Sequence, residues 1–191
     1  MDVKTNIKGL KQGGRLVLLE VSAQDGPTNI VPDLCRQLAE RRINIAFMNL
    51  SCDGAAHSAF CCIEKNDRTS AVSCIEQEPY LAKAVKICPN DVGLLSIYPH
   101  QASLNVLGIA LQLISDDKIT LHGFASSIAA LTFVFDYDCL DKATTLLANA
   151  LRLVPEQIVR EPAYRLRQEM PLMTSHMPNK STRCENDKDF D

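Results

Sequence analysis

The sequence carries one pattern of apolar residues twice, and this repeat constrains the possible folds more than any other feature. Residues 16–51 and 92–127 each read as a strand, a polar loop, an amphipathic helix and a second strand, at an offset of 76 residues. Few identities survive between the copies, but the apolar positions do; Leu38, for example, corresponds to Ile114. Repeats of a small α/β unit are more typical of a binding scaffold than of a one-piece enzyme.

Each copy continues into a return strand, a second helix and a final strand. In the first copy the pattern predicts strands at 15–22, 43–50, 56–64 and 84–88, and helices at 30–42 and 68–78. In the second copy it predicts strands at 92–98, 119–125, 129–137 and 157–160, with a helix after the first, N-capped by Ser103, and another after the third, N-capped by Asp138. The order β-α-β-β-α-β is that of ferredoxin-like folds. We therefore predict an α+β protein of two ferredoxin-like units, with antiparallel sheets and helices on one face.

These elements suggest a division of the chain into three parts. We expect unit one in residues 1–88, with a leading strand at 3–10, and unit two in residues 89–165. Residues 166–191 are polar, interrupted by proline and without periodicity. Such a segment cannot bury enough apolar area to offset its ordering entropy, so we expect a disordered tail.

Composition argues against nucleic-acid and membrane partners. The net charge is −3, whereas nucleic-acid-binding domains are usually strongly basic. The two strands that would present RNA-stacking residues, at 43–50 and 56–64, hold only two phenylalanines. No apolar run approaches the roughly 20 residues that span a bilayer, and residues 1–14 contain no apolar signal-peptide core. We therefore expect a cytoplasmic protein.

The sequence shows no recognisable catalytic or metal motif. The zincin, nucleophile-elbow and Walker patterns are missing, and of the paired carboxylates Asp138 reads as a helix cap and Asp136 as a solvated residue. The eight cysteines are expected to be reduced, and most lie among apolar neighbours. Cys61 and Cys62 are adjacent in a strand, so their side chains should point to opposite faces and cannot share an ion. We therefore predict no enzyme activity, no cofactor and no metal.

The loop after the first strand of unit one is the best candidate for a ligand site. It reads DGPTN and leads into a helix, whose free backbone N–H groups favour a carboxylate. Asp25 in this loop is a candidate partner for an ammonium group, so the loop has partners for both ends of an α-amino acid. A plain turn followed by a helix cap has the same composition, and the residues alone leave both interpretations open.

A resemblance to a known family adds to this interpretation. The stretch from Asn6 to Asn49 resembles the first ACT domain of aspartate kinases, with a leading strand, an Asp-x-Pro loop, a helix ending in LAE and then I-N-I. The stretch ITLHGFASSIAALTFVFDYDCLDKATTLL resembles their second ACT domain, in which a Ser-Ser turn precedes the return strand. The likeness covers the chain from Asn6 to Arg165 and leaves no segment that resembles the kinase.

The resemblance implies paired ACT units that form a homodimer and bind a small amino acid where a loop meets a strand across an interface. In unit one, the implied contacts are Asp25, Gly26, Pro27, Thr28, Asn29, Ile30, Asn44, Ile45 and Ala46. In unit two, they are His100, Gln101, Ser103, His122, Ser126 and Ser127. The resemblance therefore implies a stand-alone regulatory or sensor protein.

Two positions depart from the family pattern. Thr28 stands where glycine often follows the proline, and Ala46 stands where the kinases often have an aspartate that would hold the ligand ammonium. These departures favour a second hypothesis, in which the pair of units is a structural interaction module that mediates assembly without a metabolite ligand.

Overall fold

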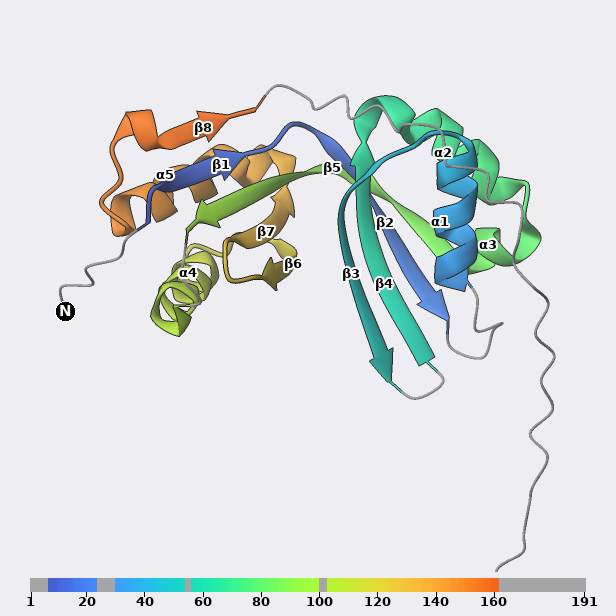
Figure 1. Ribbon diagram of the computed structural model, residues 1–191, viewed down its shortest axis with the longest axis horizontal. Helices are drawn as coiled ribbons and strands as arrows, with labels where there is room; N and C mark the ends of the chain where they lie inside the picture. Colours follow the sequence, from blue (N-terminus) through green and yellow to red (C-terminus); the bar gives the residue numbers. More distant parts are fainter. Residues whose placement is uncertain (1–6, 24–29, 54–55, 100–102, 162–191) are drawn as a thin grey trace, which may run out of the picture.

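The computed structural model describes residues 7–23, 30–53, 56–99 and 103–161 (Figure 1). The strands are β1 (Gly9–Gln12), β2 (Leu16–Ala23), β3 (Ile45–Asp53), β4 (Ala56–Glu64), β5 (Val85–Tyr98), β6 (Leu121–Ser126), β7 (Leu131–Asp136) and β8 (Ile158–Arg160). The helices are α1 (Ile30–Glu40), α2 (Arg68–Glu76), α3 (Pro79–Ala84), α4 (Leu104–Asp116) and α5 (Leu140–Ala150). Short 3-10 turns precede α2, α5 and β8. The predicted α+β class with two ferredoxin-like units is confirmed.

Strand β5 is shared between the two units. Its first half pairs with β2 in unit one, giving the strand order β3-β4-β2-β5. Its second half pairs with β7 and β1 in unit two, giving the order β6-β7-β5-β1-β8. The strands predicted at 84–88 and 92–98 are therefore one continuous strand. Pro89 lies inside it, where a register shift opposite β2 makes a bulge that tolerates proline.

The leading strand differs from its predicted position. It spans Gly9–Gln12 instead of 3–10; residues 3–6 lie outside the described residues, and Ile7 and Lys8 precede the strand. It also joins unit two, because it pairs antiparallel with β5 and parallel with β8. Unit one is thus inserted between β1 and the rest of unit two, and the predicted boundary at residue 88 falls within the shared strand.

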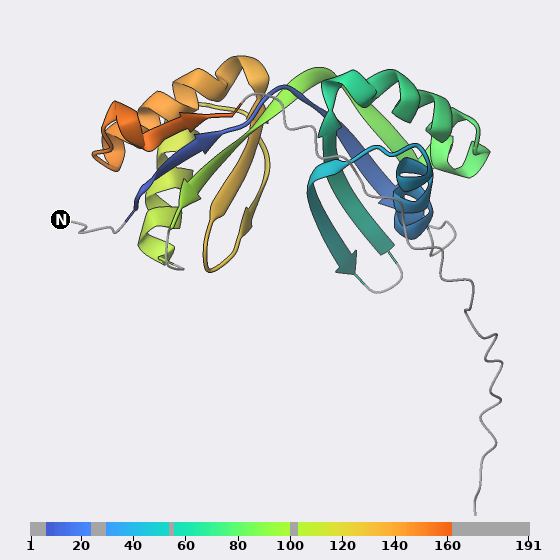
Figure 2. The same cartoon turned by 45° about the horizontal axis from the view of Figure 1, so that its top comes forward.

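Each unit has its own core between its sheet and its helices. In unit one, α1, α2 and α3 pack on alternate residues of β2 and β4, such as Val17, Leu19 and Cys61. In unit two, α4 and α5 pack on residues such as Leu95 and Phe133. The helices lie on the outer sides of the molecule (Figure 2). The two helix-free sheet faces are consequently turned towards each other, which gives the molecule the shape of an arch.

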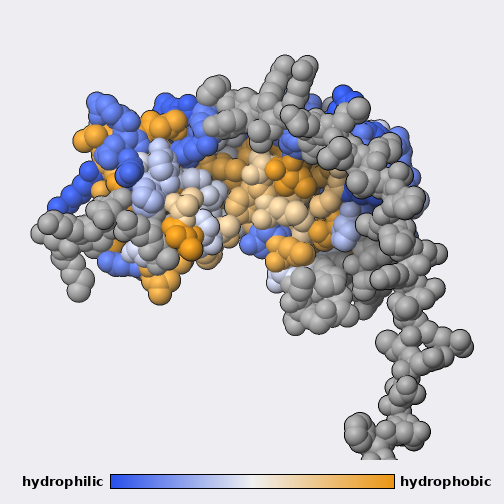
Figure 3. Space-filling view, in the orientation of Figure 1, coloured by the Kyte–Doolittle hydropathy of each residue, from blue (hydrophilic) through white to orange (hydrophobic). Residues whose placement is uncertain are grey.

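A third apolar cluster joins the units across the inside of the arch. It is buried and consists of Leu16, Leu18, Cys62, Cys88, Val92 and Val134. Phe47, Phe60 and Leu94 extend it, and a hydrophobic surface is visible in the hollow between the units (Figure 3). Cys61 and Cys62 belong to different clusters, so the prediction that they point to opposite faces is confirmed.

At one close contact between the units, the residue on unit two is a glycine. A Cβ atom added to Gly123 on β6 would lie 2.2 Å from Cζ of Phe60 on β4. The Phe60 ring is itself stacked on Phe47, with the ring centroids 5.6 Å apart. The stacking restricts movement of the Phe60 ring. The contact between the units therefore depends on the absence of a side chain at Gly123.

We expect Gly123→Ala to destabilise the protein by about 1–3 kcal/mol, because overpacking at this contact pushes β6 away from Phe60. Gly108→Ala is the matched control, since nothing lies within 4 Å of its added Cβ on the exposed side of α4. That change should raise the free energy of unfolding by up to about 1 kcal/mol. Urea denaturation of both variants measures the difference. Equal stability of the two variants would contradict the packing assigned to Gly123.

Candidate functional site

In unit one, the predicted strand residues lie at the end of the sheet opposite to Ala23, the last described residue before the predicted loop. Asp25, Gly26, Pro27, Thr28 and Asn29 lie outside the described residues, between the end of β2 and Ile30, which is buried at the start of α1. The end of β2 is level with the end of β3, since both pair with the start of β4. Asn44, Ile45 and Ala46 lie at the start of β3, which is level with Val17. Six strand residues, or about 20 Å, therefore separate the loop from these three residues.

In unit two, the structure brings some predicted residues together and separates one. His100 and Gln101 lie outside the described residues. Ser103 is the N-cap of α4, as predicted, and its hydroxyl accepts a hydrogen bond from the Val106 amide at 3.4 Å. Ser126 and Ser127 end β6 beside the end of β5, so they lie at the same end of the sheet as the loop. His122 lies at the other end, next to unit one.

Two of the predicted residues occupy matching β-bulges. The register of β3 with β4 shifts at Ala46, and the register of β6 with β7 shifts at His122. These residues correspond at the 76-residue offset of the repeat. A bulge re-aims the side chain that it carries. Both residues line cavities between the units: Ala46 one of about 450 Å³, and His122 one of about 340 Å³.

Comparisons with known proteins show which fold this arrangement of helices and strands has. No protein-family model and no curated protein matches the sequence. Among solved structures, the ligand-free regulatory subunit of aspartate kinase from Thermus thermophilus aligns with a TM-score of 0.64 at 16% identity, over 75% of this chain and 97% of that subunit. The regulatory subunit from Thermus flavus gives 0.65 at 18% identity, over 78% and 99%.

The chain has the fold of an aspartate kinase regulatory subunit. The aspartate kinase from Synechocystis aligns over 87% of this chain but only 30% of its own length, with a TM-score of 0.66 and 14% identity. The shared part is the paired-ACT region, and the remainder of that kinase has no counterpart in the aligned chain. The resemblance inferred from the sequence is thereby confirmed at the level of the fold.

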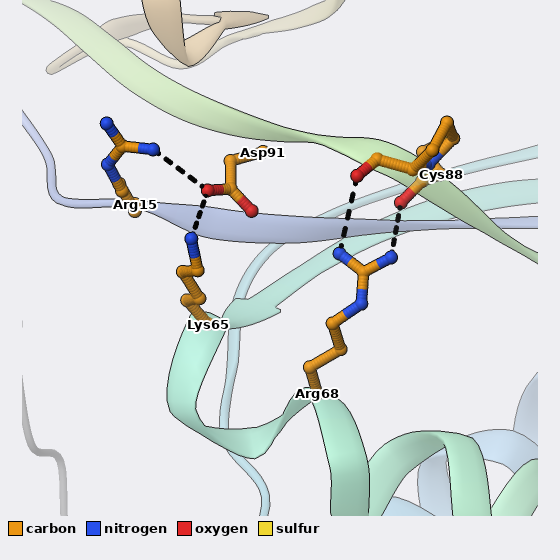
Figure 4. Close-up of polar contacts among 6 residues, drawn as sticks. Arg15, Lys65, Arg68, Cys88 and Asp91 are labelled. Atoms are coloured by element: carbon orange, nitrogen blue, oxygen red, sulfur yellow. Dashed lines mark hydrogen bonds and ion pairs between the residues drawn. The ribbon is translucent and has the colours of Figure 1, made fainter.

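A group of charged residues surrounds β5 at the point where this strand passes from unit one to unit two (Figure 4). The Asp91 carboxylate accepts hydrogen bonds from Lys65 at 2.6 Å and from Arg15 at 3.1 Å. The two cations lower the pKa of Asp91 below its ordinary value. Arg15 also stacks on the Tyr137 ring of unit two, 4.2 Å from its centroid. This cluster was missed in the sequence, because it forms only once three distant segments meet.

Arg68 supports the same crossing through the backbone. Its guanidinium donates hydrogen bonds to the carbonyl oxygens of Cys88 and Pro89, at 3.3 and 3.5 Å (Figure 4). The bulge at Pro89 takes this part of β5 out of register with β2. Backbone carbonyls that leave a ladder need other partners, and Arg68 provides them.

Asp136 has a different role from the one predicted. Its carboxylate pairs with the His122 ring nitrogen Nε2 at 2.8 Å, across the β6–β7 ladder. Asp138 does not cap α5, whose N-cap is Cys139, but lies in the preceding 3-10 turn. The two carboxylates thus belong to separate environments. Spacing along the chain gave no sign of the His122–Asp136 pair, because it joins two strands.

Cys61, Cys62, Cys74 and Cys88 are buried among apolar residues, whereas Cys35 and Cys139 are half-buried. Burial raises the pKa of Cys61 to about 12 and raises that of Cys62 as well. Thiols with raised pKa values are poor nucleophiles and poor metal ligands. Among the described residues, no group of three or more His, Cys, Asp or Glu side chains is placed to hold a metal ion.

We expect Asp91→Asn to lower the free energy of unfolding by about 1 kcal/mol at pH 7, because it removes a charged acceptor shared by two half-exposed cations. The lowered pKa means that this stabilisation is present above the ordinary carboxyl pKa, near 4, and is lost as the pH falls through the folded-state value. Urea denaturation at pH 7, 5 and 3 should therefore show a difference that shrinks with acidity. Glu76→Gln, on the exposed side of α2, is the control and should show no such difference.

Proposed function

We propose that the protein is a stand-alone regulatory or sensor module that binds a small amino acid where ACT units meet, and that it works as a homodimer. The observation that supports this proposal is the distance of about 20 Å along the sheet between Ala23, the last described residue before the loop, and the strand residues at the start of β3. A site that uses both sets needs a second copy, whose strand end lies against the loop end of the first. Ligand binding and dimerisation are therefore linked.

The chemistry of the loop supports an amino acid as ligand. The N-terminus of α1 follows the loop directly, and helix N-termini favour carboxylates. The bulge position of unit one carries Ala46, so the ammonium partner in this site is Asp25. E. coli aspartokinase III, whose structure was determined in complex with lysine and aspartate, aligns over 78% of this chain with a TM-score of 0.56 at 11% identity.

The proposal is for a protein without catalytic activity or cofactor, located in the cytoplasm and without nucleic-acid or membrane partners. The regulatory subunits that share the fold support it, since the chain covers nearly their whole length. No helix in the described part of the chain is long and apolar enough to cross a membrane.

A structural interaction module is the second candidate function. Apolar side chains are exposed at the end of unit two that is distant from unit one: Leu104 is 81% exposed at the start of α4, and Ile128 is 84% exposed in the β6–β7 turn. Phe124 on β6 is also partly exposed. Exposed apolar residues that gather at one end of a fold indicate a contact surface. This surface favours assembly, whether or not a metabolite binds.

A thermal-shift screen with the twenty amino acids at millimolar concentration separates the two functions. A ligand at ten times its Kd stabilises the native state by about 1.4 kcal/mol, which raises the melting temperature of a chain of this size by several degrees. Asp25→Ala should abolish the shift, whereas Glu76→Ala on α2 should retain it. A screen with no shift for any amino acid would rule out the sensor function and leave the interaction module.

The linkage between binding and dimerisation has its own measurement. Light scattering during gel filtration should give a dimer mass, and the dimer should dissociate at lower protein concentrations when the amino acid is present than when it is absent. Asp25→Ala should remove this effect of the amino acid. A monomer at every concentration, with or without ligand, would contradict a site built from two copies.

A further inference from the structure

A cavity of about 450 Å³, which Ala46 lines, lies between the two units. Its walls come from both units of a single chain, with Phe47 and Glu64 on one side and Ser96 and Thr132 on the other. Its volume falls in the range of small-molecule sites, which often lie between domains. It lies at the end of unit one opposite to Ala23, the last described residue before the loop at 24–29.

The unit-two wall presents a row of polar side chains on three neighbouring strands. Lys11 on β1 and Thr132 on β7 both lie directly opposite Ser96 on β5, so all three share the helix-free face. The two hydroxyl groups are hydrogen-bonded to each other at 2.8 Å. Lys11 forms an ion pair with Glu161, which also lines the cavity. One ammonium group and two hydroxyl groups in a row suit a carboxylate ligand.

The unit-one wall presents a carboxylate. Glu64 ends β4 opposite Leu16, is half-buried, and faces the same cavity. Glu161 is more enclosed, with a side chain that is 14% exposed. Carboxylates near a row of donors give the cavity partners for an ammonium group as well. Groups of both charges in one small cavity match a zwitterion better than an anion or a cation alone.

The floor between these polar groups is apolar. Leu16 and Leu94 belong to the cluster that joins the units, and the Phe47 ring flanks them. Gly13 and Ala46 at the edge add little side-chain volume, which leaves the floor accessible. An apolar side chain on the ligand would bury this surface and thereby strengthen binding.

We propose that this cavity binds one α-amino acid with an apolar side chain, its carboxylate on Lys11, Ser96 and Thr132 and its ammonium group on Glu64. The site goes beyond the proposed function, because one copy of the chain forms it and no residue of the 24–29 loop takes part. A ligand here contacts both units. It therefore favours the angle between the units at which it contacts both of them. The size of this effect depends on how much more tightly the ligand binds at that angle than at others.

Amide chemical shifts of the full chain, titrated with L-leucine, test the site directly. The expected shifts centre on Phe47, Ser96 and Thr132. Two analogues of leucine act as probes of the zwitterion: 4-methylpentanoate lacks the amine, and 3-methylbutylamine lacks the carboxylate. Each should bind at least tenfold more weakly than leucine, since each loses a charge-assisted contact.

Two variants assign the contacts. Glu64→Gln keeps the shape of the side chain but removes its charge, and Ser96→Ala with Thr132→Val removes both hydroxyl groups with little change in volume. Each variant should weaken leucine binding about tenfold or more. Glu76→Gln on α2 is the control and should bind as the unchanged protein does. The proposal would be overturned if both cavity variants bound leucine as tightly as the unchanged protein does.

The same titration keeps this site distinct from the loop site. Shifts around Ser96 that persist in Asp25→Ala and disappear in Glu64→Gln support the cavity, independently of the dimer interface. An amino acid whose binding is lost in Asp25→Ala, without shifts around Ser96, overturns the cavity site and leaves the proposed function standing. Failure of L-leucine, L-valine, L-methionine and L-phenylalanine to shift any cavity amide at millimolar concentration overturns the cavity site as well.

Discussion

The sharing of β5 between two sheets is the constraint on which the rest of the structure depends. A straight strand would carry the sheet of unit one directly into that of unit two, with both helix-free faces open to water. The bulge at Pro89 bends the strand, and a bent strand turns the two faces towards each other. Arg68 stabilises the bend by donating hydrogen bonds to the backbone carbonyls that have no partner in β2, and the Asp91 side chain stabilises it by pairing with Lys65. The apolar cluster around Leu18 and Val134 then closes between the faces.

The order of the helices and strands was predictable because each element has its own local spacing of apolar residues. Alternation and helical spacing extend over a few residues, and they identified the hairpins and most of the helices in both copies. The position of β1 was not predictable in the same way. Three of its four residues pair with β8, almost 150 residues later, and a strand of four residues with a single large apolar side chain carries no mark of the sheet edge that it joins. The first and the last described strands, β1 and β8, therefore both belong to unit two, which periodicity alone does not show.

The candidate site was predictable only in part, for a related reason. Ser103 was recognised as a cap because a cap is a local feature of the chain. The bulges at Ala46 and His122 are shifts of register between two strands, and one extra residue moves the side chains that follow it to the other face. A pattern that assumes strict alternation cannot show where such a shift falls. The resemblance implied strand residues that meet a loop across an interface, whereas the structure shows that two of them, Ala46 and His122, line cavities between the units.

The two bulges also show where the copies of the repeat have diverged in function. The scaffold holds the same position in both units, but it carries Ala46 in one and His122 in the other. The small alanine side chain leaves the larger cavity open beside it. The histidine projects into the smaller cavity and is held by Asp136. Both cavities border the one apolar cluster that joins the units, so a molecule in either cavity acts on the same contact. The two copies of the unit thus contribute to two chemically different cavities that border the same apolar cluster.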